Sequence, residues 1–202
     1  MNRIFEFIEF ASAFLSSPQM IRSLLQENGN RSRFSFIVSI LSSVSLSTGI
    51  FYLRDSYSNG FLILIPICAI LIFVFLRFYS RLFSSRLLQI ITKTGNYEVD
   101  SHSFLDILIE GSFLPNLFFL PLCITAKEFS IPALILIPGS LSLVIWMLYI
   151  QFVGLTFTLE IDPRRTAFLL LRNHLLMVTY PIFAAFTISM IIMSLFGVRG
   201  AA

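Results

Sequence analysis

Residues 61–79 read FLILIPICAILIFVFLRFY, and this stretch decides the fold class of the chain. It contains no charged residue before Arg77. A helix needs about 20 mostly apolar residues to cross the hydrocarbon core of a bilayer, which is roughly 30 Å thick. The stretch therefore predicts a membrane-spanning helix and an integral membrane protein.

The composition of the whole chain agrees with this prediction. Of its 202 residues, 56% are hydrophobic and only 12% are charged, whereas soluble domains carry about 25% charged residues. No polar segment is long enough to enclose a soluble catalytic domain. The net charge of +3 comes from basic residues that are spread thinly beside apolar runs, which argues against a nucleic-acid partner. The lipid bilayer is the partner that the composition predicts.

Further apolar stretches on both sides predict an all-α polytopic membrane bundle of five transmembrane helices. The spans are expected at about 34–53, 61–79, 104–126, 131–155 and 175–196. Residues 34–197 then form the membrane domain. Residues 1–33 mix Phe and Ile with Glu at short spacing, and they are expected to form an amphipathic segment at the cytoplasmic interface.

Two of these helices are expected to extend beyond the membrane. RFYSRLFSSRLLQIITK, which ends at Lys93, continues the helical pattern of residues 61–79. A helix from 61 to about 93 is roughly 50 Å long, so its last turns must project beyond a core of about 30 Å. Asp162-Pro163 likewise predicts a helix start well before the fifth span.

The distribution of Lys and Arg predicts the orientation, because cytoplasmic loops of membrane proteins are enriched in both. Eleven basic residues fall on one side of the predicted spans: Arg3, Arg22, Arg31, Arg33, Arg77, Arg81, Arg86, Lys93, Arg164, Arg165 and Arg172. Three fall on the other: Arg54, Lys127 and Arg199. The N-terminus is therefore expected in the cytoplasm and the C-terminus outside, and a bacterial cytoplasmic membrane is the favoured location.

Two carboxylates, Asp106 and Glu110, lie one helical turn apart near the start of the third span. Ser103 and Asp106 have the spacing of a capping box, which favours a structural role for Asp106 at the helix start. Glu110 lies deeper, where an ionised carboxylate is costly unless it is paired or hydrated. Arg172 and His174 lie at the cytoplasmic end of the fifth span. We expect them to form an intramembrane polar cluster with the two acids, in which Arg172 pairs with Glu110 or Asp106.

The sequence holds no recognisable catalytic, cofactor or metal motif. Glycine patterns that bind phosphates or dinucleotides are absent, as are the zinc-protease and serine-hydrolase patterns. The two histidines, His102 and His174, cannot form a metal site without other ligands, and Cys68 and Cys123 are expected to be unbridged residues inside apolar runs. We therefore expect no catalytic residue, no cofactor, no metal and no enzymatic activity.

Three stretches give the chain the layout of a known family. These are FLSSPQMIRSLLQE before the first span, RLLQIITKTGNYEVDSHSFLDILIEGSFLP, and WMLYIQFVGLTFTLEIDPRRTAFLLLRNHLLMVTYP. A basic helix end, Gly95, Phe104, Pro115 and Pro181 follow one another in them. In this order the chain resembles the Yip domain family, five-pass membrane proteins named for their interaction with Ypt/Rab GTPases. It has neither the long polar N-terminal tail nor the acidic-Tyr-Gly-Pro stretch of the eukaryotic members, so it is more similar to the compact bacterial relatives. The resemblance implies no catalytic residues.

Two functions are consistent with these patterns. The first is a non-enzymatic scaffold or adaptor of the Yip type that binds other membrane proteins, and a homo-oligomer is compatible with it. Its predicted contacts with a partner or with lipid headgroups are Arg81, Arg86, Arg164 and Arg165. The alternative is a small transporter or permease subunit in which Asp106 and Glu110 relay protons or cations. A dry Glu110 packed on Arg172 favours the scaffold, whereas a water-filled cavity that reaches Glu110 favours transport.

Overall fold

The regular elements of the protein are helices throughout the residues that its computed structural model describes, which are 2–18, 21, 31–53, 59–92, 101–177 and 179. They are α1 (Asn2–Ser16), α3 (Arg31–Leu53), α4 (Asn59–Thr92), α5 (Ser101–Gly111), the 3₁₀ helix η2 (Leu114–Phe118), α6 (Phe119–Glu128) and α7 (Ala133–Leu159). A further helix covers 163–177. The all-α prediction is therefore confirmed.

Four helical stretches are long and apolar enough to cross a membrane. They cover Arg33–Leu53, Ile63–Ile91, Phe104–Glu128 and Ile135–Phe157, close to the first four predicted spans. The fifth predicted span, 175–196, lies almost wholly outside the described residues. The prediction of several helices that are long and apolar enough to cross a membrane is thus confirmed, while the count of five and the sides on which the two termini lie stay predictions.

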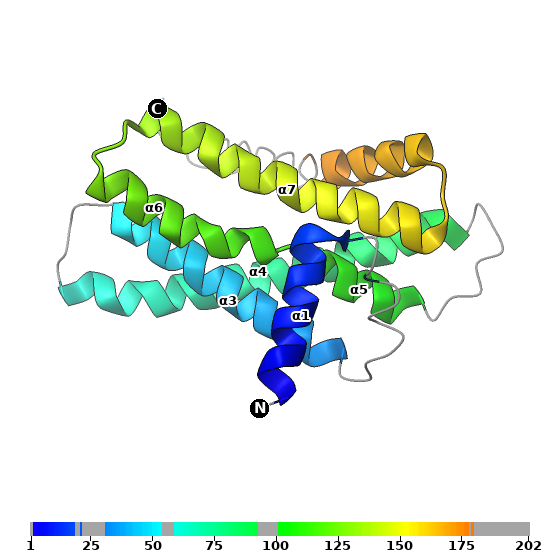
Figure 1. Cartoon of the computed structure of the whole chain (residues 1–202), viewed down its shortest axis with the longest axis horizontal. Helices are drawn as coiled ribbons and strands as arrows, with labels where there is room; N and C mark the ends of the chain where they lie inside the picture. The colour runs from blue at the N-terminus through cyan, green and yellow to red at the C-terminus, as the bar shows by residue number, and fades with distance from the viewer. Residues whose placement is uncertain are drawn as a thin grey trace, which may run out of the picture.

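The helices α3, α4 and α7 run along the long axis of the molecule, and α5, η2 and α6 follow one another beside α3 (Figure 1). α4 has 34 residues and is about 51 Å long at 1.5 Å per residue. It continues past the start of α3 (Figure 1), which confirms the predicted continuation of this helix to about residue 93. One end of the bundle holds the start of α3, the end of α4 and the start of helix 163–177. We call it the basic end. It carries Arg33, Arg81, Arg86, Arg164 and Arg165.

The outward faces of α4 and α7 are apolar, as lipid contact requires. The large hydrophobic side chains exposed on them include Ile63, Ile67, Ile70, Leu71, Val74, Phe75, Ile135, Ile137, Leu141, Val144 and Ile145. A soluble monomer rarely exposes an apolar surface of this extent. These faces therefore suit a bilayer rather than water.

The third predicted span is not one continuous helix. α5 ends at Gly111, the chain turns, and η2 then leads into α6. Two prolines favour this break: Pro121 has no N–H to donate to the carbonyl of Leu117 four residues earlier, and Pro115 likewise has none for the carbonyl of Gly111. The third predicted span, 104–126, lies within a stretch that is long and apolar enough to cross a membrane, and this stretch breaks in its middle section.

Serines of α3 form hydrogen bonds with backbone groups at the break. The Ser45 hydroxyl donates to the carbonyls of Asn116 (2.8 Å) and Leu117 (3.1 Å), and it accepts from the N–H of Leu120 at 3.2 Å. The Ser42 hydroxyl donates to the carbonyl directly before η2 at 2.9 Å. Non-helical backbone at membrane depth is tolerated only where its polar groups are satisfied by protein or by enclosed water. The serine-rich buried face of α3 is what allows the third span to break.

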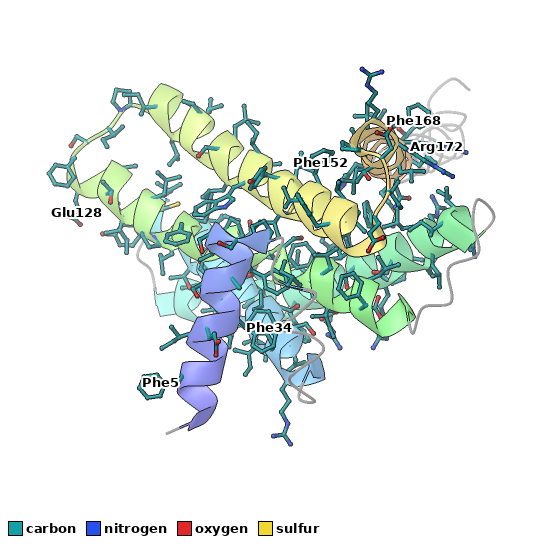
Figure 2. All side chains as sticks on the ribbon, turned by 45° about the vertical axis from the view of Figure 1, so that its right-hand side comes forward. Phe5, Phe34, Glu128, Phe152, Phe168 and Arg172 are labelled. Carbon is teal, nitrogen blue, oxygen red and sulfur yellow. The ribbon has the colours of Figure 1, made fainter. Side chains whose placement is uncertain are left out.

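The N-terminal helix α1 crosses the bundle steeply and packs into it (Figure 1). Phe14 is fully buried, and the rings of Phe10 and Phe14 lie 5.3 and 5.2 Å from the ring of Phe34 near the start of α3. A Cβ atom on Gly111 would overlap the ring of Phe14, so α1 reaches the break in the third span at its glycine. Phe5 is exposed and points away from the bundle (Figure 2). α1 is thus an amphipathic helix whose buried side packs against protein.

Of two helix starts that the sequence predicts, the structure confirms one. Helix 163–177 begins at Pro163, and the N–H of Thr166 donates to the carbonyl of Asp162 at 3.0 Å. α5 begins at Ser101 and has no acid in its first turn. The capping role predicted for Asp106 is therefore wrong, because Asp106 lies inside α5, where it is half-buried.

Candidate functional site

Glu110, at the end of α5, forms a buried ion pair with Arg77 of α4. Arg77 donates from Nη1 to Oε1 at 2.8 Å and to Oε2 at 2.7 Å, and the Ser80 hydroxyl donates to Oε1 at 3.1 Å. Glu110 is only 2% exposed, whereas the Arg77 side chain is 27% exposed. Because Arg77 and Ser80 are one turn apart on α4, both reach the same carboxylate. The pair neutralises a charge that would be costly within a membrane.

A chain of neutral hydrogen bonds runs beside this ion pair. Tyr79 Oη and Nδ1 of His174 are 2.6 Å apart, and Nε2 of His174 lies 2.8 Å from Oε1 of Gln151. Gln151 Nε2 donates to Ser112 Oγ at 2.8 Å, and the Ser112 hydroxyl donates to the carbonyl of Ile109 at 2.6 Å. An amide oxygen only accepts, so this network assigns the His174 proton to Nε2 and makes Nδ1 the acceptor for Tyr79.

The ion pair and the chain together join four segments: α4, the end of α5 with the turn after it, α7 and helix 163–177. We call this set the polar core; its members are Arg77, Tyr79, Ser80, Glu110, Ser112, Gln151 and His174. Next to it, Asn173 is buried and donates from Nδ2 to the carbonyl of Phe83 at 3.2 Å. The polar core therefore fixes helix 163–177 against α4 and α7.

His174 is held in its neutral form. The centre of its ring lies 4.6 Å from the ring centre of Phe83. His174 itself is outside the four stretches that are apolar and long enough to span a membrane. Burial lowers the pKa of His174 to about 4. The folded protein therefore favours the neutral imidazole at neutral pH, which agrees with the tautomer that the hydrogen bonds require.

The structure brings some of the predicted cluster residues together and separates others. Glu110 and His174 both belong to the polar core. The pairing predicted for Glu110 and Arg172 is wrong, because Arg77 takes the carboxylate and Arg172 is exposed. Arg172 projects from helix 163–177 on the side away from α7 (Figure 2). Asp106 lies one turn before Glu110 on α5 and is half-buried.

The arginines predicted to contact a partner or lipid headgroups lie at the basic end. Arg81, Arg164 and Arg165 are exposed, and Arg86 is half-buried. Phe168 is exposed on the same helix as Arg164 and Arg165 (Figure 2). This part of the surface therefore combines positive charge with an exposed aromatic ring.

The polar core, as defined above, contains no cysteine. Cys68 and Cys123 are free thiols, as predicted. Within the described ranges, no group of three or more His, Cys, Asp and Glu side chains is arranged to hold a metal ion.

Sequence reasoning missed Arg77 and Gln151 as site residues. The sequence alone presents Arg77 as one of the cytoplasmic charges that predict the orientation, and it assigns no role to Gln151 in the fourth span. Both are isolated polar residues inside predicted spans. Polar side chains within membrane helices almost always face the bundle interior and find a partner there. That signal, applied to these two residues, would have found them.

No family model matches the chain, and no curated protein or solved structure matches it. The resemblance to the Yip domain family therefore stays a prediction that rests on the layout of its residues.

Proposed function

We propose that the chain is a non-enzymatic integral membrane protein of the Yip type, a scaffold or adaptor that binds other membrane proteins. In this proposal it crosses a bacterial cytoplasmic membrane five times, with its N-terminus in the cytoplasm and its C-terminus outside. The observation that carries the proposal is the closed ion pair between Glu110 and Arg77.

The ion pair supports a scaffold because both oxygens of the intramembrane acid are engaged. Glu110 accepts two hydrogen bonds from Arg77 and one from Ser80, and it is 2% exposed. An acid that carries protons or cations has to exchange them along a polar pathway. A buried acid held by an arginine instead ties α5 to α4 and fixes the arrangement of the bundle.

The surface offered to a partner lies at the basic end. Arg164 and Arg165 are exposed in the first turn of helix 163–177, and Arg81 is exposed on α4. Helix 163–177 is anchored to the bundle through His174 and Asn173, so these charges sit on a fixed support. Charges on such a surface contribute mostly to specificity and to the rate of association, which suits an adaptor.

Partner capture in the native membrane tests the proposal. We expect a tagged full-length chain, crosslinked and then gently solubilised, to enrich a defined membrane protein over an unrelated five-pass control. Arg164→Gln/Arg165→Gln should lose this partner, because it removes two exposed cations without touching the polar core. Arg3→Gln/Arg33→Gln removes the same charge from α1 and α3 and should retain it. Enrichment no better than the control protein, or a partner indifferent to both variants, would contradict the adaptor.

A second candidate, a transporter or permease subunit, is favoured by the break in the third span. α5 ends at Gly111, directly after Glu110, and discontinuous helices line the ion sites of many transporters. In this alternative Asp106 and Glu110 relay protons or cations. Purified protein in liposomes loaded with a pH-sensitive dye should then show a flux that Glu110→Gln abolishes. A flux that Glu110→Gln leaves intact would exclude this role for the acid.

A further inference from the structure

Arg77 bonds Glu110 through only one of its three guanidinium nitrogens. Both bonds to the carboxylate come from Nη1. A guanidinium also donates from Nε and Nη2, and in the part of the chain that the structure describes no acceptor is bonded to either of them. The Arg77 side chain is 27% exposed. These donors are therefore left for an acceptor outside the described protein.

The surface around Arg77 is apolar and aromatic. Its guanidinium carbon lies 5.7 Å from the ring centre of Phe36 on α3. Phe36 is exposed and packs edge-on against Phe73 of α4, with ring centres 5.6 Å apart. Val74 and Phe78, which flank Arg77 on α4, are also exposed. Side chains of this kind face lipid in a membrane helix, so the acceptor for Arg77 is expected within a lipid layer.

The position of Arg77 along α4 places it where that layer changes from chains to headgroups. The apolar run that predicts the second span ends at residue 79, only two residues further on. Arginine side chains near helix ends extend towards the interface. Phosphate oxygens are the strongest acceptors found there, and a planar guanidinium matches them better than any other side chain.

Two further cations give this surface a net positive charge. Arg81 is exposed one turn after Arg77 on the same side of α4, and Arg33 is exposed one turn before Phe36 on α3. α3 and α4 pack against each other and run in opposite directions, and Arg33 lies towards the start of α3 while Arg81 lies towards the end of α4. Glu110 cancels the charge of Arg77. The charges of Arg33 and Arg81 then favour a ligand with net negative charge.

We infer that the surface where α3 meets α4 binds the phosphate of one anionic phospholipid in the leaflet at the basic end. Nη1 of Arg77 holds Glu110 while Nε and Nη2 donate to the phosphate. Arg33 and Arg81 select a negatively charged headgroup over a zwitterionic one, and Phe36 and Phe73 contact the lipid chain. This inference does not rest on the proposed adaptor function: the capture experiment above tests Arg164 and Arg165, and Arg81 is the one residue common to both surfaces.

Native mass spectrometry of the purified, delipidated full-length chain tests the inference. Phosphatidylglycerol and phosphatidylcholine with identical acyl chains are titrated separately. We expect the first phosphatidylglycerol to bind at least about tenfold more tightly than phosphatidylcholine, because Arg33 and Arg81 attract only a headgroup with net negative charge. Arg77→Lys should weaken the binding of both lipids, because one ammonium can hold Glu110 but lacks the outward donors for the phosphate that both lipids carry. Its melting temperature, measured in parallel, should stay close to that of the original chain.

Two further variants make the outcome decisive even if Arg77→Lys does not fold. Arg33→Gln/Arg81→Gln leaves the Arg77–Glu110 pair intact but removes the two cations that select the headgroup. This variant should lose the preference for phosphatidylglycerol. Its matched control, Arg164→Gln/Arg165→Gln, removes the same charge from helix 163–177 and should keep it. Equal loss in both double variants would show a mere effect of total charge and would overturn the inference.

The remaining arms distinguish a lipid from a free anion. Inorganic phosphate is added at increasing concentration to the lipid-bound protein, and we expect it to leave the lipid in place. Displacement of the lipid by inorganic phosphate would assign the site to a free phosphate and would overturn the phospholipid. Equal affinity for the two lipids in the original chain would overturn it as well.

Discussion

Removing one partner of the Arg77–Glu110 pair at a time should destabilise the protein unequally. Arg77→Met leaves a carboxylate that is 2% exposed without its cation, and an uncompensated buried charge costs about 3–5 kcal/mol. Glu110→Gln leaves a guanidinium that is 27% exposed and can turn towards headgroups. We expect that change to cost about 1–2 kcal/mol, because a charge that reaches polar surroundings keeps most of its solvation.

The double variant Arg77→Met/Glu110→Gln removes both charges together. Replacing a buried ion pair by neutral groups is often close to neutral, and Ser80 still has an amide to bond. We therefore expect a loss of about 1–2 kcal/mol, well below the sum of the two single losses. The coupling energy between the two sites should be about 3–5 kcal/mol, at or above the upper end of the range for residues in direct contact.

Unfolding in mixed micelles, followed by the fluorescence of Trp146, measures these losses. Trp146 is the single tryptophan of the chain. It stacks on Phe118 at 5.7 Å and donates to the carbonyl of Leu15 at 3.3 Å, so its signal reports on the packing of α1 and α7. Arg81→Met, at an exposed position one turn away, is the control and should cost less than about 0.5 kcal/mol. The reasoning is refuted if Glu110→Gln is as costly as Arg77→Met, or if the two losses simply add.

Three further outcomes follow from other parts of the structure. Gly111→Ala should cost about 1–3 kcal/mol and make α1 more accessible to protease, because the new Cβ overlaps the buried ring of Phe14; an unchanged cleavage rate would argue against this docking of α1. Ser45→Ala should cost about 1–3 kcal/mol in the same unfolding assay, because the hydroxyl serves groups on both sides of the proline break, whereas the exposed Ser12→Ala should cost almost nothing. Acidification should destabilise the protein through His174. Its pKa in the folded protein, about 4, lies below the value of about 6.5 in the unfolded chain. The contribution of His174 to stability is therefore full above pH 6.5 and is lost as the pH falls towards 4. The loss at pH 5 should be roughly 1 kcal/mol, discounted because the ring is only half-buried, and His174→Gln should flatten this pH dependence while His102→Gln should not.

The sequence predicts those parts of the fold that depend on local pattern. Apolar runs locate the helices α3, α4 and α7, because a span has to be long and apolar whatever it packs against. Asp162-Pro163 predicts the start of helix 163–177, since proline favours the first turn of a helix wherever it stands. The same local logic fails for Asp106, because the spacing of a capping box does not show that the helix begins there.

The break in the third span depends on contacts that are distant in the sequence. Pro115 and Pro121 permit a break but do not require one, because proline is common in membrane helices. The break is stabilised by Ser45 on α3, which bonds backbone groups there. Its partner Asn116 is 71 residues away in the sequence. No pattern within 104–126 reveals that partner.

The polar core was predicted in part for a similar reason. An acid at membrane depth has to be paired or hydrated, so Glu110 was correctly expected to need a partner. Arg77 and Arg172 both lie near span ends that the sequence predicts to be cytoplasmic, and only the rotation of their helices decides between them. Arg77 faces α5 and Arg172 faces outward. Rotation of one helix against another is set by packing, which a single sequence does not report.

Synthesis of the chain delivers α3 to the membrane before the third span emerges. Ser45 is then already in place to bond the Leu117 carbonyl, to which Pro121 cannot donate, and the N–H of Leu120. A chain that started after Leu53 would bring those groups into lipid, where each unsatisfied one costs several kcal/mol. The first span therefore acts as an assembly template for the third. Coexpression of residues 1–53 as a separate fragment should rescue the insertion of a chain that lacks them.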